Sequence, residues 1–100
     1  MSIKGTQARA ARILVQWPRA HVARLARIEE EVLSAFETNC QPLDAEETQR
    51  LRHVLETGGA VFLPEDDDGG MGVRLKFPSK DVRAIDRMEN EGGAYGSDDI

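Results

Sequence analysis

Basic side chains are concentrated at the amino end of this chain, where they could bind phosphate groups. The sequence holds 13 lysines and arginines, and residues 1–28 contain six of them and no acid. These six are Lys4, Arg9, Arg12, Arg19, Arg24 and Arg27. The net charge of −5 argues by itself against a nucleic-acid partner, but the separation of charges predicts one electropositive face. The alternative is that these arginines only solvate the outer faces of helices.

Three consecutive glutamates, Glu29–Glu31, follow directly after this basic segment. One carboxylate can accept a hydrogen bond from N4 of cytosine, which suits a surface that contacts bases. Three of them also repel a polyanion: a carboxylate–phosphate pair about 6 Å apart, at an effective dielectric near 40, costs roughly 1–1.5 kcal/mol. With two facing DNA, the penalty is about 2–3 kcal/mol, against the ~4–10 kcal/mol that separates specific from non-specific binding. The glutamates therefore weaken DNA binding without excluding it, and they could equally dock on a basic protein.

Apolar spacing predicts three short helices that would position these charges. The first runs over residues 6–16, where apolar positions recur at three- and four-residue steps. Those positions are Ala8, Ala11, Leu14 and Val15. Pro18 ends this helix, since the residue before a proline avoids helical geometry, and it can begin a second helix over residues 18–26. A third helix is expected over about residues 29–36, with acids in its first turn complementing the helix dipole.

Residues 17–37, WPRAHVARLARIEEEVLSAFE, have the spacing of a helix-turn-helix. The positions at which two such helices must bury side chains against each other are small or apolar. They are Val22, Ala23, Ala26, Ile28, Leu33 and Phe36. Ala23 is small where the helices cross, and Ile28 is apolar just past the turn.

A fourth helix and a β-hairpin are expected to follow. Asp44 can cap the helix, with Glu47 completing a capping box, and the glycines at 58–59 end it. Residues 60–63 and 73–77 are short apolar runs on either side of an acidic, glycine-rich turn, which is typical of a hairpin. Residues 78–100 have the composition of an acidic, flexible tail, in which residues 81–88 could add a helical turn or two.

This order of elements resembles the small single-domain regulators of the Cro/repressor-like (XRE) helix-turn-helix family. The resemblance covers about residues 6–77, where QARAARILVQW and the motif quoted above are followed by LRHVLETGGAVFLPE and GMGVRLKF. It implies a mainly α, lambda-repressor-like helix-turn-helix domain of four or five helices followed by a short β-hairpin. That domain would occupy residues 1–77, with its hairpin at 60–77. It also implies a third helix in the major groove of double-stranded DNA, often in a dimer.

The resemblance also implies which residues contact DNA. In such regulators a polar side chain at the start of the second helix holds a phosphate, and Arg19 takes that place here. Base contacts come from the start of the third helix. The residues expected to bind DNA are therefore Arg12, Arg19, Arg24, Arg27, Glu29, Glu30, Glu31, Ser34 and Asn39. The family usually has a left-handed glycine where this chain has Arg27, and a non-glycine residue there costs about 1–2 kcal/mol.

The hairpin has two interpretations. It either caps the helical core or presents an edge that pairs with a second copy. The residues of such a dimer interface would be Val61, Leu63, Val73 and Leu75. Because two strands alone are marginal in water and a free edge recruits partners, we favour the dimer. A two-fold dimer would bind half-sites about 34 Å apart.

Catalysis, metal binding and membrane insertion have no support in the sequence. No nucleophile–base pair is visible, so we expect neither an enzyme nor a cofactor. His21, His53 and the only cysteine, Cys40, lack companions at ligand spacing, and the acids at 65–68 lack the calcium-loop pattern. No apolar run approaches the roughly 20 residues of a membrane span, and one cysteine suits a reducing cytoplasm.

The sequence as a whole predicts a cytoplasmic, homodimeric and sequence-specific transcriptional regulator. The alternative is a degenerate helix-turn-helix that acts as a protein-interaction module, such as an anti-activator or antitoxin-like adaptor with a basic partner. The glutamates at 29–31 are the reason to keep both hypotheses open.

Overall fold

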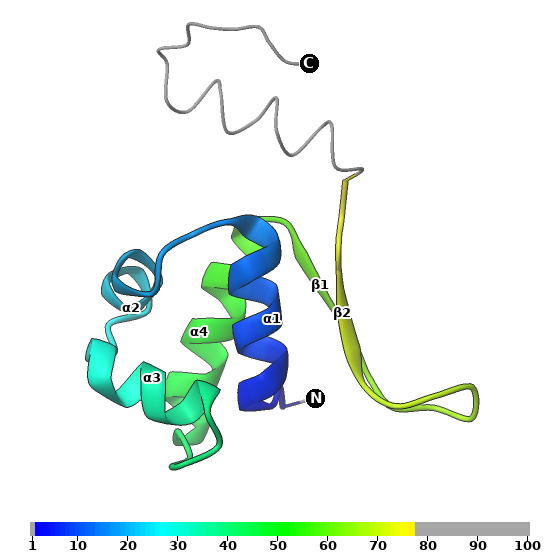
Figure 1. Cartoon of the computed structure of the whole chain (residues 1–100), viewed down its shortest axis with the longest axis horizontal. Helices are drawn as coiled ribbons and strands as arrows, with labels where there is room; N and C mark the ends of the chain where they lie inside the picture. The colour runs from blue at the N-terminus through cyan, green and yellow to red at the C-terminus, as the bar shows by residue number, and fades with distance from the viewer. Residues whose placement is uncertain (1, 78–100) are drawn as a thin grey trace, which may run out of the picture.

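The computed structural model describes residues 2–77, which form four helices and a two-stranded antiparallel sheet (Figure 1). The elements are α1 (Gly5–Val15), α2 (Arg19–Ala26), α3 (Glu30–Glu37), α4 (Ala45–Thr57), β1 (Ala60–Leu63) and β2 (Gly72–Leu75). The expected mainly helical chain with a closing hairpin is confirmed. The expected acidic tail at 78–100, with its possible helical turn at 81–88, lies outside the described residues.

Local sequence signals explain where the helices begin and end. The capping box expected at α4 is present, because Glu47 N donates to Asp44 Oδ1 at 2.7 Å and Asp44 N donates to Glu47 Oε1 at 3.2 Å. α1 ends one residue earlier than expected, since Gln16 adopts the left-handed conformation with φ 64°. The helix therefore stops at its own cap, two residues before Pro18.

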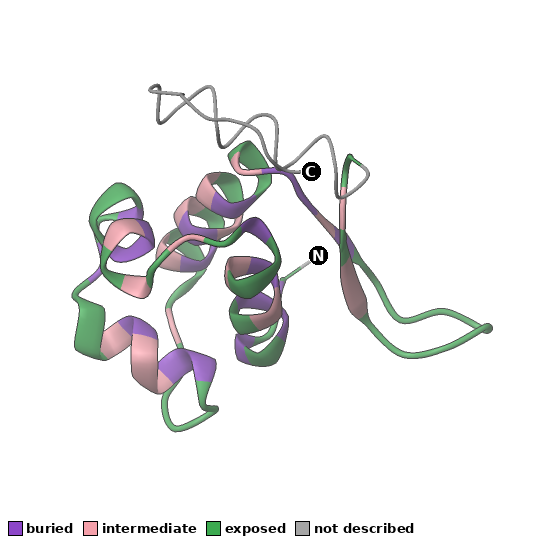
Figure 2. Cartoon of the chain, turned by 45° about the horizontal axis from the view of Figure 1, so that its top comes forward, coloured by how far each residue is buried: buried purple, intermediate pink, exposed green. Residues whose placement is uncertain are grey.

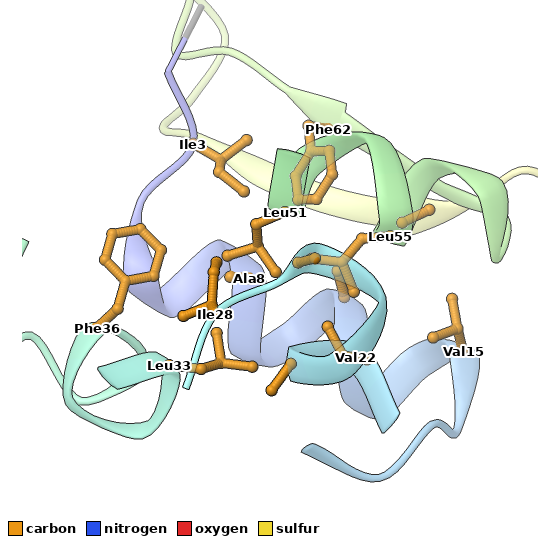
Figure 3. Packing of buried hydrophobic residues seen from close by; sticks show 14 residues of the cluster. Ile3, Ala8, Val15, Val22, Ile28, Leu33, Phe36, Leu51, Leu55 and Phe62 are labelled. Atoms are coloured by element: carbon orange, nitrogen blue, oxygen red, sulfur yellow. The ribbon is translucent and has the colours of Figure 1, made fainter. Parts of the chain in front are cut away.

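Small residues allow the helices to approach one another around a core of larger side chains (Figure 3). The largest fully buried apolar side chains are Leu33, Leu51, Leu55, Val15 and Val22. Figure 2 shows the buried positions on the inward sides of the helices. The expected place of Leu14 in the buried stripe of α1 is wrong, because Leu14 is 36% exposed. The other three predicted positions of that stripe, Ala8, Ala11 and Val15, are buried.

The hairpin packs one face on the helices and leaves the other face open. Ala60 pairs with Leu75 and Phe62 with Val73, and directly opposed residues share a face of a sheet. This face contacts the core. The four expected dimer residues are therefore divided: Val73 and Leu75 are on the core side, whereas Val61 and Leu63 are on the outer side. β2 also begins and ends earlier than the expected 73–77.

A buried glutamine attaches the hairpin to α1. Gln7 is 4% exposed, and its Nε2 donates to the carbonyl oxygens of Gly72 at 2.9 Å and Leu63 at 3.4 Å. Its Oε1 accepts from the backbone N–H of Lys4 at 2.9 Å. One side chain thus forms hydrogen bonds with a carbonyl group of each strand and with the backbone N–H before α1. These bonds hold the hairpin against that helix.

Gly5 permits α1 to begin against the end of α3. A Cβ atom at this position would collide with the backbone carbonyl of Phe36, which belongs to the last turn of α3. The contact is with backbone rather than with a flexible side chain, so the two helices could not both keep their positions.

We predict that Gly5→Ala destabilises the fold by about 1–3 kcal/mol, the usual range for overpacking. The sign is informative, because alanine inside a helix normally stabilises by roughly 0.5–1 kcal/mol over glycine. Urea unfolding followed by circular dichroism measures the difference. Gly70→Ala is the matched control, since nothing lies within 4 Å of its added Cβ, and it should be close to neutral. A Gly5→Ala protein as stable as the wild type would contradict this packing.

Candidate functional site

α2, the turn after it and α3 form a compact unit on the side of the molecule opposite the hairpin (Figure 1). We call residues 18–38 the α2–α3 unit. All six positions that the sequence marked for packing are buried, with exposures from 0% to 9%. They are Val22, Ala23, Ala26, Ile28, Leu33 and Phe36. The unit also carries the residues expected to bind DNA, except Arg12 of α1 and Asn39 just after the unit.

The turn of the α2–α3 unit is fixed by its own backbone and by a side chain of α4. Arg27 has φ 59° and ψ 47°, the left-handed geometry expected at this position, and its N–H donates to Arg24 O at 3.2 Å. Arg50 of α4 donates its Nε to Ala26 O at 2.8 Å and its Nη2 to Arg27 O at 3.3 Å. These bonds satisfy carbonyls at the end of α2 that the helix leaves free.

A buried carboxylate joins the first three helices. Glu37 of α3 has a side chain only 1% exposed, and its Oε2 accepts from Arg12 Nε at 2.9 Å. Its Oε1 accepts from Arg12 Nη2 at 3.1 Å and from Arg19 Nε at 3.1 Å. We call these three residues the Glu37 cluster. Because a buried charge is stable only when it is paired and hydrogen-bonded, the cluster holds α1, α2 and α3 in one arrangement.

The Glu37 cluster changes the roles expected of Arg12 and Arg19. Arg12 is 13% exposed in its side chain and donates to Glu37 and to Trp17 O, so it supports the helices and has no free face for phosphate. We therefore leave Arg12 out of the proposed interface. Arg19 is 31% exposed, and only its Nε is bonded within residues 2–77. Its Nη groups remain open to a ligand.

The acidic residues gather beside Arg19. A shallow hollow is lined by Arg19, the three glutamates at 29–31, and Ser34. All three glutamates are exposed, and none forms an ion pair within the described part of the chain. Glu29 is the residue before α3, and the other two lie in its first turn. The structure thus brings Arg19 and the expected base-contacting residues onto one surface.

The other expected residues do not line this hollow, and Asn39 lines a separate one beside the start of α1. Arg24 is exposed on α2, and its Nη2 lies 3.0 Å from Nδ1 of His21. Arg27 is exposed at the turn, and Asn39 is exposed just past α3, with φ 63°. Cations therefore come from α2 and the turn, whereas α3 itself contributes only carboxylates and small polar groups. Such a surface can bind an anion at one side and accept hydrogen bonds at the other.

Two supporting residues, Glu37 and Arg50, were not anticipated from the sequence. Glu37 follows Phe36 and lies four positions after Leu33, so it falls on the buried stripe of α3. A charge at such a position must have a partner, and Arg12 stands next to Ala11 on the corresponding stripe of α1. The presence of opposite charges on the two buried stripes could have predicted this ion pair. No sequence pattern could have predicted the bonds of Arg50, because its acceptors are backbone carbonyls.

Comparison with known proteins does not assign this chain to a family. No protein-family model matches it, and no curated protein matches it. Within residues 2–77 no group of three or more histidine, cysteine, aspartate or glutamate side chains is placed to hold a metal ion. Over the same residues, every helix is too short or too polar to cross a membrane.

We predict that Glu37→Gln destabilises the fold by about 3–5 kcal/mol, because two arginines lose their buried counter-charge. Arg19→Ala should cost about 1 kcal/mol or less, since that pair is partly exposed. Chemical denaturation of each variant measures the differences. Glu56→Gln is the matched control: Glu56 pairs with Arg52 at 2.8 Å on the surface of α4, and its loss should cost less than about 0.5 kcal/mol. Equal effects of Glu37→Gln and Glu56→Gln would show that the Glu37 cluster does not hold the helices.

Proposed function

We propose that the α2–α3 unit is a helix-turn-helix and that this protein is a sequence-specific DNA-binding transcriptional regulator acting as a homodimer. The observation that carries the proposal is the presentation of α3. One side of α3 is buried through Leu33 and Phe36, and the other side is exposed behind a turn held in left-handed geometry. A short exposed helix on a rigid support is what the major groove accepts.

In this proposal the cations hold the backbone and α3 contacts the bases. The Nη groups of Arg19, together with Arg24 and Arg27, bind phosphates on either side of the groove. Glu30 and its neighbours accept hydrogen bonds from exposed base amino groups, of which cytosine N4 is the best match. Ser34 bonds to either kind of base edge, and Asn39 bonds to the backbone.

A second candidate is a protein-interaction module that docks a basic partner on α3. The observation that favours it is the absence of any lysine or arginine among residues 30–37, together with three exposed and unpaired carboxylates before and in the first turn. The two candidates differ in one simple experiment. Retention of genomic DNA fragments at low salt supports the regulator, whereas no retention and co-purification of a basic protein support the adaptor.

We predict that the full chain binds a palindromic DNA fragment selectively and that its affinity for this DNA falls steeply as the salt concentration rises. Arg27→Gly should weaken binding to all sequences alike and reduce the salt slope by about one per subunit. The same variant should be more stable, by up to roughly 1 kcal/mol, because glycine adopts the left-handed conformation without steric strain.

Weaker DNA binding together with higher stability would show that Arg27→Gly removes a DNA contact and does not disturb the fold. Fluorescence anisotropy with labelled duplexes measures affinity, and thermal unfolding measures stability. The control is Arg9→Gln at an exposed position on α1, outside the proposed contacts. Unchanged affinity of Arg27→Gly across the salt series would contradict the proposed phosphate contact.

A further inference from the structure

We propose that the free edge of β2 pairs with the same edge of a second copy, in antiparallel orientation, to form a four-stranded sheet. The order of strands would be β1–β2 of one copy followed by β2–β1 of the other. This interface supplies the homodimer of the proposed function and rests on that function for its biological use. Its formation does not require DNA, so the two can be tested apart.

The backbone of β2 has hydrogen-bonding groups available at this edge. Lys76 N donates to Gly59 O at 2.7 Å, in the same register as the Ala60–Leu75 pair. Hydrogen-bonded and non-hydrogen-bonded pairs alternate along an antiparallel ladder. The Phe62–Val73 pair is therefore a non-hydrogen-bonded one, and the N–H and C=O of Val73 point away from β1. Neither group has a partner within residues 2–77.

Exposed apolar side chains lie at both ends of β2 and on the helix that packs against it. Of the six large hydrophobic side chains exposed in residues 2–77, only Leu25 lies outside α1 and the hairpin segment. Met71, 44% exposed, and Phe77, 38% exposed, flank the two ends of β2. Ile13 is 57% exposed on α1, the helix that packs against β2. A second copy that extends the sheet would cover these exposed apolar side chains. Exposed apolar patches of this kind mark protein–protein interaction sites.

The charges of the hairpin favour pairing through β2 rather than β1, and in antiparallel rather than parallel orientation. Arg74 and Lys76 lie toward one end of β2, and the acids at 65–68 lie in the turn at the other end. A two-fold axis near Val73 places the basic end of each copy beside the acidic turn of the other, so opposite charges meet twice. Parallel pairing would place like charges together. β1 contains no charged residue, so pairing through its edge gains no such attraction.

A charge-exchange experiment tests this interface on the full chain by sedimentation velocity without DNA. The wild type should be a dimer. One variant, Arg74→Glu with Lys76→Glu, is acidic at both ends of the hairpin, and a second, Glu65→Lys with Asp67→Lys and Asp68→Lys, is basic at both. Asp66 is kept, because its Oδ1 accepts from Asp68 N and Gly69 N. Each variant alone should dimerise about tenfold or more weakly, and an equimolar mixture should recover a heterodimer of near wild-type affinity.

The matched control is Arg24→Glu with Arg27→Glu, which makes the same change of charge on the opposite side of the molecule and should leave the dimer intact. Circular dichroism confirms that every variant is folded. A monomeric wild type, variants that dimerise as tightly as the wild type, or a mixture that stays monomeric would each overturn the proposal. A dimer that shows the charge exchange but binds no DNA would instead reject the proposed function and leave this interface standing.

Discussion

The buried carboxylate of Glu37 is the constraint on which the arrangement of the helices depends. Its side chain is 1% exposed, so its charge must be balanced inside the protein. Arg12 of α1 and Arg19 of α2 provide that balance from two separate helices. Neither α1 nor α2 can move relative to α3 without leaving a charge unpaired. Gly5 and Arg50 complete the support, the first at the end of α3 and the second at the turn.

α1 links the two surfaces to which we assign functions. Arg12 reaches the Glu37 cluster on one side of the helix, and Gln7 reaches both strands of the hairpin on another. A dimer formed through β2 would therefore set the distance between the two copies of α3 through rigid contacts rather than through a linker. In a two-fold regulator this distance determines the spacing of the half-sites. The position of α1 thus connects the proposed assembly with the proposed recognition.

Features set by neighbours in the sequence could be predicted, and features set by contacts between helices could not. The capping box at Asp44 and the six packing positions of the α2–α3 unit follow from short-range patterns, and the left-handed geometry at Arg27 follows from the resemblance; all are present. The burial of Leu14 was predicted from its spacing alone, but the inward side of α1 is narrower than that pattern suggested. Arg12 was predicted to bind DNA, because its ion pair with Glu37, 25 residues away in the sequence, could not be predicted from neighbouring residues.

The same distinction applies to the candidate site. Its acidic character was visible in the sequence, because Glu29–Glu31 are consecutive. Their exposure and their lack of ion pairs depend on the fold. The position of Arg19, which bonds to Glu37 and is also partly exposed to solvent, depends on the fold as well. The two short apolar runs predicted a hairpin, but only the packing against α1 and α4 decides which face of that hairpin is buried.

The central claim is that the exposed side of α3 contacts DNA despite its carboxylates. The most direct test is the change in backbone amide chemical shifts when duplex DNA of mixed sequence is added to the ¹⁵N-labelled full chain at low salt. The account predicts shifts concentrated at Arg19, at the turn around Arg27, and from Glu29 to Ser34, with the hairpin largely unchanged. No shifts in the α2–α3 unit, or shifts confined to other parts of the molecule, would contradict it.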